Sequence, residues 1–308
     1  MANLGSNAFE VELLTTQYSS VLELLLQQKT SKLRGLVASG AHEGKMASPV
    51  QQVGNVEFRQ PEGRFAPIAF QLPNYTRRWV FPNDRDCGVP VDTFDLLRTI
   101  IDPKAQLNEA VSAAANRFFD QLIVNCAFAS SSIGVDASGL TTESWPATTY
   151  LVNEDFGASA ATGMTYDKFI EAKRILRHYE NDLDTMSPVM IIGSQQEADL
   201  LKAQEAISKE YQDRPVVVDG NVTRMAGMNI VVSERLEYAS NIRSCICTMP
   251  NGLYLGVWKD MTLNITNRTD LSGQPWQLYA MLSAGATRLE LGRVVEVQCA
   301  DTTTGPVV

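Results

Sequence analysis

Histidine is the side chain best suited to acid–base catalysis near neutral pH, and this sequence contains two, His42 and His178. Glu43 follows His42, but position 46 is a methionine, so the HExxH pattern of zinc proteases is not completed. His178 falls in a predicted helix among arginines and a glutamate, which indicates a solvent-exposed face. A nucleophilic serine in a G-x-S-x-G turn is also missing from the sequence. We therefore expect no catalytic residues and no hydrolase chemistry.

The five cysteines offer the other reactive groups. Cys245 and Cys247 are two residues apart, so in a strand both thiols would point to the same side. A structural zinc ion needs four ligands, and the remaining cysteines, at 87, 126 and 299, stand alone. The segment of residues 1–6 is polar and has no apolar core, so we expect no signal peptide. Without secretion the cysteines would stay reduced, and we expect them to be buried thiols. Neither a Walker sequence nor G-x-G-x-x-G is present, so we expect no metal and no cofactor.

The net charge is −9, from 35 acidic and 26 basic residues. Tight, non-specific binding of nucleic acid needs a basic surface, so this composition disfavours it. An acidic chain is compatible either with simple solubility or with a container wall that must not adhere to enclosed DNA. No apolar run approaches the roughly 20 residues of a membrane helix, so we expect no membrane partner.

Charged residues of both signs are concentrated in one predicted extended region. One interpretation is an exposed strand edge that charge protects from aggregation. The other is complementary pairing with a second copy of the same chain, where many weak ion pairs set the register. We take the following as candidate subunit contacts: Arg59, Glu62, Arg64, Arg77, Arg78, Asp84, Arg85 and Asp86.

Residues 9–28 are predicted to form an amphipathic helix, because apolar residues recur at steps of three and four. Two interpretations remain open for this helix. It packs on its own domain, or it is an N-terminal arm that docks on a neighbouring subunit. Leu22 and Leu25, in its most apolar part, are candidate contacts for the second interpretation.

Residues 53–72 are predicted to form a two-stranded hairpin. Strands at 53–60 and 64–72 flank a Gln60-Pro61-Glu62-Gly63 stretch, which suits a type I turn. A lone hairpin is only marginally stable in water. We therefore expect this hairpin to lie on another surface.

Asp102-Pro103 predicts the start of a long helix that runs to about residue 128, since Asp caps free N–H groups and Pro suits the first turn. A Ser- and Gly-rich loop with a short hairpin follows at 130–162. Alternating helices and strands then predict an α/β lobe, and the last residues return as strands. The predicted helices are 166–179 and 194–211, and the predicted strands are 189–192, 216–218, 228–232, 253–257, 261–266, 277–286 and 288–298.

The order of these elements resembles the major capsid proteins of tailed bacteriophages, which have the Hong Kong 97 phage-type fold. The resemblance extends over nearly the whole chain. It is carried by the following residues: 74–79, 91–98, Asp102-Pro103, Arg117, Asp120 and Gly134. It implies an α+β fold with an N-terminal arm, an extended hairpin loop, a peripheral domain with a long spine helix, and an α/β axial domain.

The resemblance also implies boundaries and a function. The implied segments are an N-terminal arm at 1–46, an extended loop at 47–88, a peripheral domain at 89–163, an axial domain at 164–259 and return strands at 260–308. The chain would assemble in the bacterial host into pentamers and hexamers of a virion head around double-stranded DNA. Its partners would be its own copies, a separate scaffold, a portal and decoration proteins.

Two alternatives stay open at this stage. An encapsulin-like compartment shell would share the fold but enclose protein cargo without a portal or DNA. A soluble α/β enzyme would lose activity when its histidines are replaced, whereas a shell protein would stay intact.

Overall fold

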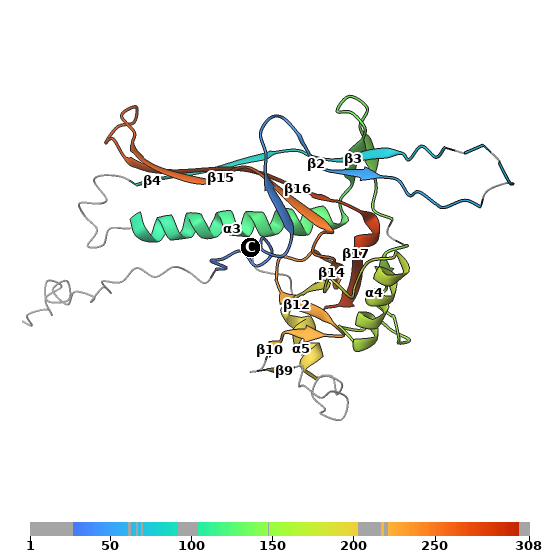
Figure 1. Ribbon diagram of the computed structural model, residues 1–308. Coiled ribbons are helices and arrows are strands. Elements are labelled where there is room, and N and C mark those ends of the chain that lie inside the picture. The colour runs from blue at the N-terminus through green and yellow to red at the C-terminus, as the bar shows by residue number, and fades with distance from the viewer. Residues whose placement is uncertain are drawn as a thin grey trace, which may run out of the picture.

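The structure is a computed structural model that describes residues 27–60, 63–65, 67–68, 70–91, 104–146, 148–202, 217–218 and 221–301. A long helix lies along a long sheet, a second sheet packs with two shorter helices, and a narrow arm projects from the body (Figure 1). The predicted α+β class is therefore confirmed. Within these ranges, none of the helices is long and apolar enough to span a lipid bilayer.

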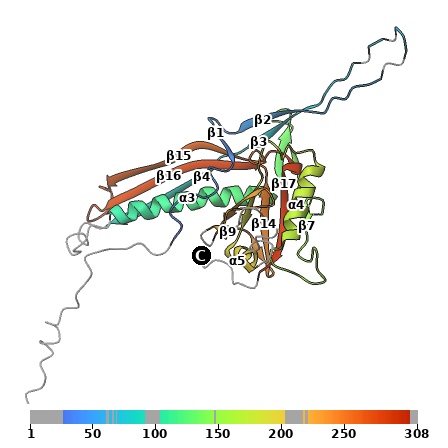
Figure 2. The same ribbon diagram turned by 60° about the horizontal axis from the view of Figure 1, so that its bottom comes forward.

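The long sheet has the strand order β1–β15–β16–β4 and packs on helix α3 (Figure 2). Along β16, every second side chain from Leu278 to Ala284 is buried, because strand side chains alternate between faces and one face meets the helix. The elements of this layer are β1 (Ala38–Ala41), β4 (Asn83–Val91), α3 (Lys104–Phe128), β15 (Leu253–Asn267) and β16 (Trp276–Arg288).

Strand β15 corrects our prediction for residues 253–266. The two strands expected at 253–257 and 261–266 form one strand, whose pairing with β16 shifts register around Lys259. A bulge absorbs the irregular residues, so the strand bends and continues. An Asn-Gly pair favours a hairpin turn, but the turn at Asn251-Gly252 does not close a hairpin. The preceding strand β14 (Ile242–Thr248) pairs with strands of the second sheet instead.

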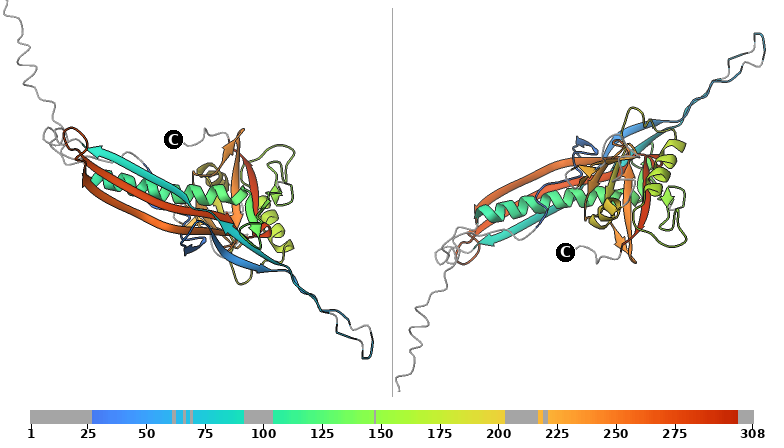
Figure 3. Two further views of the ribbon diagram at one scale, coloured as in Figure 1. Left: turned by 90° about the horizontal axis from the view of Figure 1, so that it is seen from above. Right: turned by 90° about the horizontal axis from the view of Figure 1, so that it is seen from below.

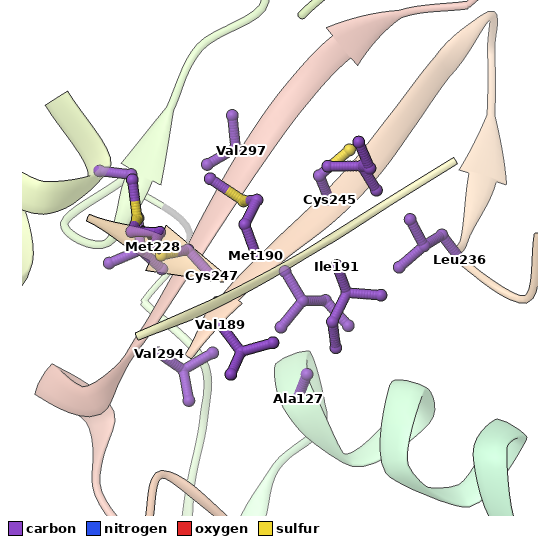
Figure 4. Close-up of a cluster of buried hydrophobic side chains, with 14 of the residues drawn as sticks. Ala127, Val189, Met190, Ile191, Met228, Leu236, Cys245, Cys247, Val294 and Val297 are labelled. Carbon is purple, nitrogen blue, oxygen red and sulfur yellow. Dashed lines mark hydrogen bonds between the residues drawn. The ribbon is translucent and has the colours of Figure 1, made fainter. Parts of the chain in front are cut away.

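The second sheet is seven-stranded and holds most of the core. Its order is β11–β12–β8–β14–β17–β7, with β13 paired to β14. The central strand β8 is buried at all four positions, because both faces of the sheet are covered. Figure 4 shows its side chains among those of β14 and β17. Besides β14, the strands of this sheet are β7 (Leu151–Val152), β8 (Val189–Ile192), β11 (Arg224–Met225), β12 (Met228–Val232), β13 (Tyr238–Ala239) and β17 (Val294–Ala300).

Two helices pack with this sheet as their patterns predict. Helix α4 (Tyr166–His178) starts after Thr165, whose hydroxyl accepts a hydrogen bond from the Lys168 N–H, and its apolar side is buried. Helix α5 starts at Ser194 as predicted, and its described part is Ser194–Lys202. Its predicted continuation to residue 211 lies outside the described residues, as do residues 102 and 103 before α3. A short strand pair follows, β9 (Val217–Val218) with β10 (Asn221–Val222).

Before β17, the predicted strand at 288–298 is partly wrong. A 3-10 turn, η1 (Leu291–Arg293), precedes β17, so the strand begins at Val294. The turn takes the chain from the long sheet to the second sheet. The strand of the long sheet therefore ends at Arg288, and the strand of the second sheet begins at Val294.

The segment at residues 54–74, called the arm from here on, projects from a small four-stranded sheet and is distinct from the N-terminal arm at 1–46. The order of this sheet is β2–β3–β5–β6, where β2 is Ala47–Val53, β3 is Tyr75–Val80, β5 is Ser131–Gly134 and β6 is Thr141–Glu143. The predicted short hairpin in the Ser- and Gly-rich loop is thus present as β5 and β6. The hairpin predicted at 53–72 is shifted, since strand pairing occurs at its base and the described residues from 54 to 74 form no strand. Figure 3 shows this segment extending from the body, at the opposite end from the β15–β16 loop.

Candidate subunit-contact surfaces

The arm between β2 and β3 presents large apolar side chains to solvent. The exposed fractions are 109% for Phe58, 98% for Phe65 and 88% for Phe70, and Ile68 and Leu72 are similarly exposed. Among the described residues, hydrogen bonds of this segment join its own two sides, such as the one from the Gly54 N–H to the Asn74 carbonyl oxygen at 2.7 Å. These side chains therefore gain no burial from the body of their own chain.

Phe65 adds a conformational observation. Its φ is 69°, in the left-handed region that bulky L-residues avoid. The cost of that region is roughly 1–2 kcal/mol for a residue other than glycine. A fully exposed phenylalanine in this conformation gains no burial within its own subunit that would offset the cost.

The candidate charges lie in several places, not in one crowded region. Arg59 and Arg64 are exposed on the arm itself. Glu62 lies outside the described residues. Our expectation of a single mixed-sign cluster is therefore wrong for the described residues, because the arm separates its own charges from those of its root.

At the arm root, Arg77 and Arg78 differ in exposure. Arg77 is half-buried, whereas Arg78 is 6% exposed and forms an ion pair with Glu143 of β6. Both terminal nitrogens of Arg78 face that carboxylate. The charge of Arg78 is thus compensated inside its own chain, and Arg78 is removed from the exposed candidates.

Asp84, Arg85 and Asp86 lie on β4, an edge strand of the long sheet. Asp84 accepts a hydrogen bond from Ser283, and the guanidinium of Arg85 lies 5.7 Å from the ring centre of Phe118. All three are exposed, so β4 remains a charged edge, as the first of our two interpretations expects.

Leu22 and Leu25 lie outside the described residues, but the chain that follows them is firmly placed. Asp120 of α3 is 0% exposed and accepts hydrogen bonds from Ser31 Oγ, the Lys32 N–H and the Leu33 N–H. A charged residue of a helix is expected on its exposed face, whereas Asp120 is buried. A carboxylate can be buried where several N–H and O–H groups compensate it. The sequence gives little signal of this role, because the donors lie about 90 residues away.

The reactive groups are arranged as structural ones. His178 is exposed on α4, and His42 Nε2 lies 2.8 Å from Tyr254 Oη, beside the ring of Trp258. Burial raises the pKa of the Cys126 and Cys247 thiols to about 12, which leaves them unreactive. Among the described residues, no group of three or more His, Cys, Asp or Glu side chains is arranged to hold a metal ion.

Comparisons with known proteins agree with this architecture. The chain is similar to a chain of the capsid of cyanophage P-SCSP1u, with a TM-score of 0.73 and 14% identity over 94% of each chain. It is similar to a chain of the cyanophage Pam1 capsid, with a TM-score of 0.72 and 11% identity over 99% of this chain and 100% of that one. A chain in the capsid of a native GTA particle gives 0.66 and 12% identity, over 95% and 97%.

At these identities the likeness shows the fold, which confirms the predicted Hong Kong 97 phage-type capsid fold. No curated protein sequence matches the chain. The model of one family, described as phage capsid protein, matches residues 12–301, which is nearly the entire sequence. This chain therefore belongs to the phage capsid protein family.

Proposed function

We propose that copies of this chain assemble as pentamers and hexamers into an icosahedral phage head, with each arm lying across a neighbouring copy. The family is one of capsid structural proteins, so the chain is a component of the virion and not an enzyme. The observation that carries the finer proposal is the row of exposed apolar side chains on the arm.

A neighbouring copy would provide the surface that the arm lacks. Burying a phenylalanine or an aliphatic side chain of this size contributes about 1.5–3 kcal/mol. Phe58, Phe65, Ile68, Phe70 and Leu72 together are enough to make one arm a strong contact, even after the ordering of the arm is subtracted. The arm and the surface that receives it are different patches, so the contact is heterologous and closes into rings when the rotation allows.

The proposed division of labour follows the elements. The second sheet with α4 and α5 would meet its copies at the ring centres, and α3 with the long sheet would form the outer part of each ring. We keep as proposed boundaries an N-terminal arm at 1–46, an extended loop at 47–88, a peripheral domain at 89–163 with its return strands at 260–308, and an axial domain at 164–259. Strands β7 and β17 lie outside 164–259 and complete the sheet of the axial domain from the peripheral segments.

The partners beyond other copies follow from the chemistry of a container. A net charge of −9 disfavours adhesion to DNA, so the shell would enclose double-stranded DNA without sequence-specific binding. A separate scaffold would set the curvature, a portal would admit the DNA, and decoration proteins would bind the outside.

Electron microscopy of the purified chain tests the proposal, with the nucleic-acid content of any particles measured in parallel. Uniform closed shells, or rings of five and six, support it. Shells that form in the producing cell around protein and exclude DNA would favour the compartment alternative. A chain that stays a single unit at high concentration, with its arm protected from proteases, would refute the proposal.

A further inference from the structure

The root of the arm contains two buried guanidinium groups, each with at least one donor that has no acceptor among the described residues. Arg78 comes from β3, and Arg288, which is 0% exposed, ends β16. The end of α3 and the β5–β6 hairpin meet them, so four parts of the fold converge here. The ion pair of Arg78 with Glu143 does not explain why a second arginine, Arg288, is buried in the same region.

Arg288 is only partly satisfied by its own chain. Its Nη1 donates to the carbonyl oxygens of Ala127 and Ala129 at 2.8 and 2.9 Å, at the end of α3. Its guanidinium carbon lies 4.8 Å from the ring centre of Trp145. Its Nε and Nη2 are buried and donate to no acceptor among the described residues.

The neighbours of Arg288 are donors as well. The indole Nε1 of Trp145 and the Nε of Arg78 are buried and also lack acceptors within the described part of the chain. Glu143 is the carboxylate paired with Arg78, so two cations share one anion. Burial lowers the pKa of Arg288, the charge of Glu143 opposes this shift, and the positive charge of Arg78 adds to it.

The orphan donors of Arg288, Trp145 and Arg78 indicate what kind of group would bind between them. Buried polar groups in folded proteins almost always have a partner, so several orphan donors in one region indicate an unassigned acceptor. A water molecule has two lone pairs with which to accept, fewer than the four orphan donor atoms of this region, Arg78 Nε, Arg288 Nε, Arg288 Nη2 and Trp145 Nε1. A small anion accepts only, and it also offsets the excess positive charge.

We propose that the arm root binds a small monovalent anion, of the size and charge of a halide, held by Arg288, Trp145 and Arg78. A cavity of about 220 Å³ adjoins the Arg78 side of this region, and its lining includes Arg78, Glu143, Tyr150, Glu290 and Arg293. Because the donors come from the arm strand β3, the loop after β6 and the end of β16, the bound anion fixes the direction in which the arm leaves the body.

Crystals of the full chain grown in sodium bromide give the direct test, since bromide has an anomalous X-ray signal. We expect a bromide peak within hydrogen-bonding distance of Arg288 Nη2 and Trp145 Nε1. A map that shows only water there, or shows these donors bonded to protein acceptors, overturns the proposal.

Thermal unfolding gives the second test, in sodium bromide against sodium gluconate at equal ionic strength, because gluconate is too large for the site. At a bromide concentration about ten times its dissociation constant, we expect the Tm to rise by about 3 °C over gluconate. Equal melting temperatures in the two salts at every concentration tested would contradict the proposal.

Variants assign the effect to the site. Arg288→Gln removes the central cation but also bonds to α3, so it carries a risk of misfolding. Trp145→Phe keeps the ring under Arg288 and removes only one donor, and we expect it to need at least threefold more bromide for the half-maximal rise in Tm. Arg174→Gln, which changes an exposed arginine paired with Glu171 on α4, is the matched control and should behave as the wild type. If Trp145→Phe and the wild type respond identically, the assignment of the site is refuted.

Discussion

Replacing two arm phenylalanines, Phe58→Ser with Phe70→Ser, separates the stability of the subunit from the stability of the shell. Both side chains are almost fully exposed in the single chain, so the free energy of unfolding should change by less than about 0.5 kcal/mol. If both become buried against a neighbour, the loss is roughly 3–6 kcal/mol per arm contact. At 1.4 kcal/mol per factor of ten, and with one arm donated per subunit, the concentration needed for assembly should rise on the order of 10²- to 10⁴-fold.

Light scattering across a concentration series, with denaturant unfolding of the unassembled chain in parallel, measures both quantities. Gln60→Ser is the matched control, because it alters an exposed residue of the same arm and removes little apolar surface. The reasoning is refuted if the double variant assembles at the wild-type concentration. It is also refuted if the double variant loses several kcal/mol of subunit stability, since that would place these rings against their own body.

Three further predictions concern the body of the subunit. Asp120→Asn should lower the free energy of unfolding by about 3 kcal/mol in denaturant titrations, because it leaves buried donors around residues 31–33 without a carboxylate; an unchanged midpoint would contradict this. Of the five cysteines, only Cys87 is exposed, so a thiol reagent should label one site in the native unassembled chain and five after unfolding; rapid native labelling of Cys247 would be inconsistent with its pKa of about 12. A hydrogen bond from Arg268 lowers the pKa of Asp270 to about 2. The ion pair should therefore be complete at pH values above the ordinary carboxyl pKa and be lost as the pH falls through about 2. An NMR titration of Arg268→Gln should return the Asp270 pKa to about 3.9, and an unchanged value would show that the pair is not its cause.

Elements with strong local signals were predictable from the sequence. Strand 189–192 is confirmed at both ends, and the helix after Thr165 agrees to within one residue, because an apolar run and a capping residue fix them locally. The order of elements was also enough to predict the capsid family. Local propensity and family resemblance point to the same architecture here.

Features that depend on distant pairing were not predictable. The β2–β3 ladder forms at residues 47–53 and 75–80, since the small sheet with β5 supports it there and nothing supports strand pairing farther out. The turn residues Gln60–Gly63 led us to predict strand pairing at 53–72, which is farther along the arm than the pairing in the structure. The unbroken β15 likewise depends on a partner strand that can absorb a bulge.

The candidate contacts show the same division. The sequence identified an arm region with charges, but it gave no way to tell that Arg78 is paired to Glu143 inside the chain. The exposed phenylalanines looked like ordinary strand residues, because alternation predicts burial of one face wherever a body lies beneath it. Only the three-dimensional arrangement shows that these side chains lack such a body in their own subunit.

The most direct test of this account is a cryo-electron-microscopy reconstruction of the assembled protein at side-chain resolution. We predict that the arm from residue 54 to residue 74 lies on an adjacent copy, with Phe58, Phe65 and Phe70 in contact with that copy. An arm that folds back on its own subunit, or that stays exposed in the finished shell, would contradict the account.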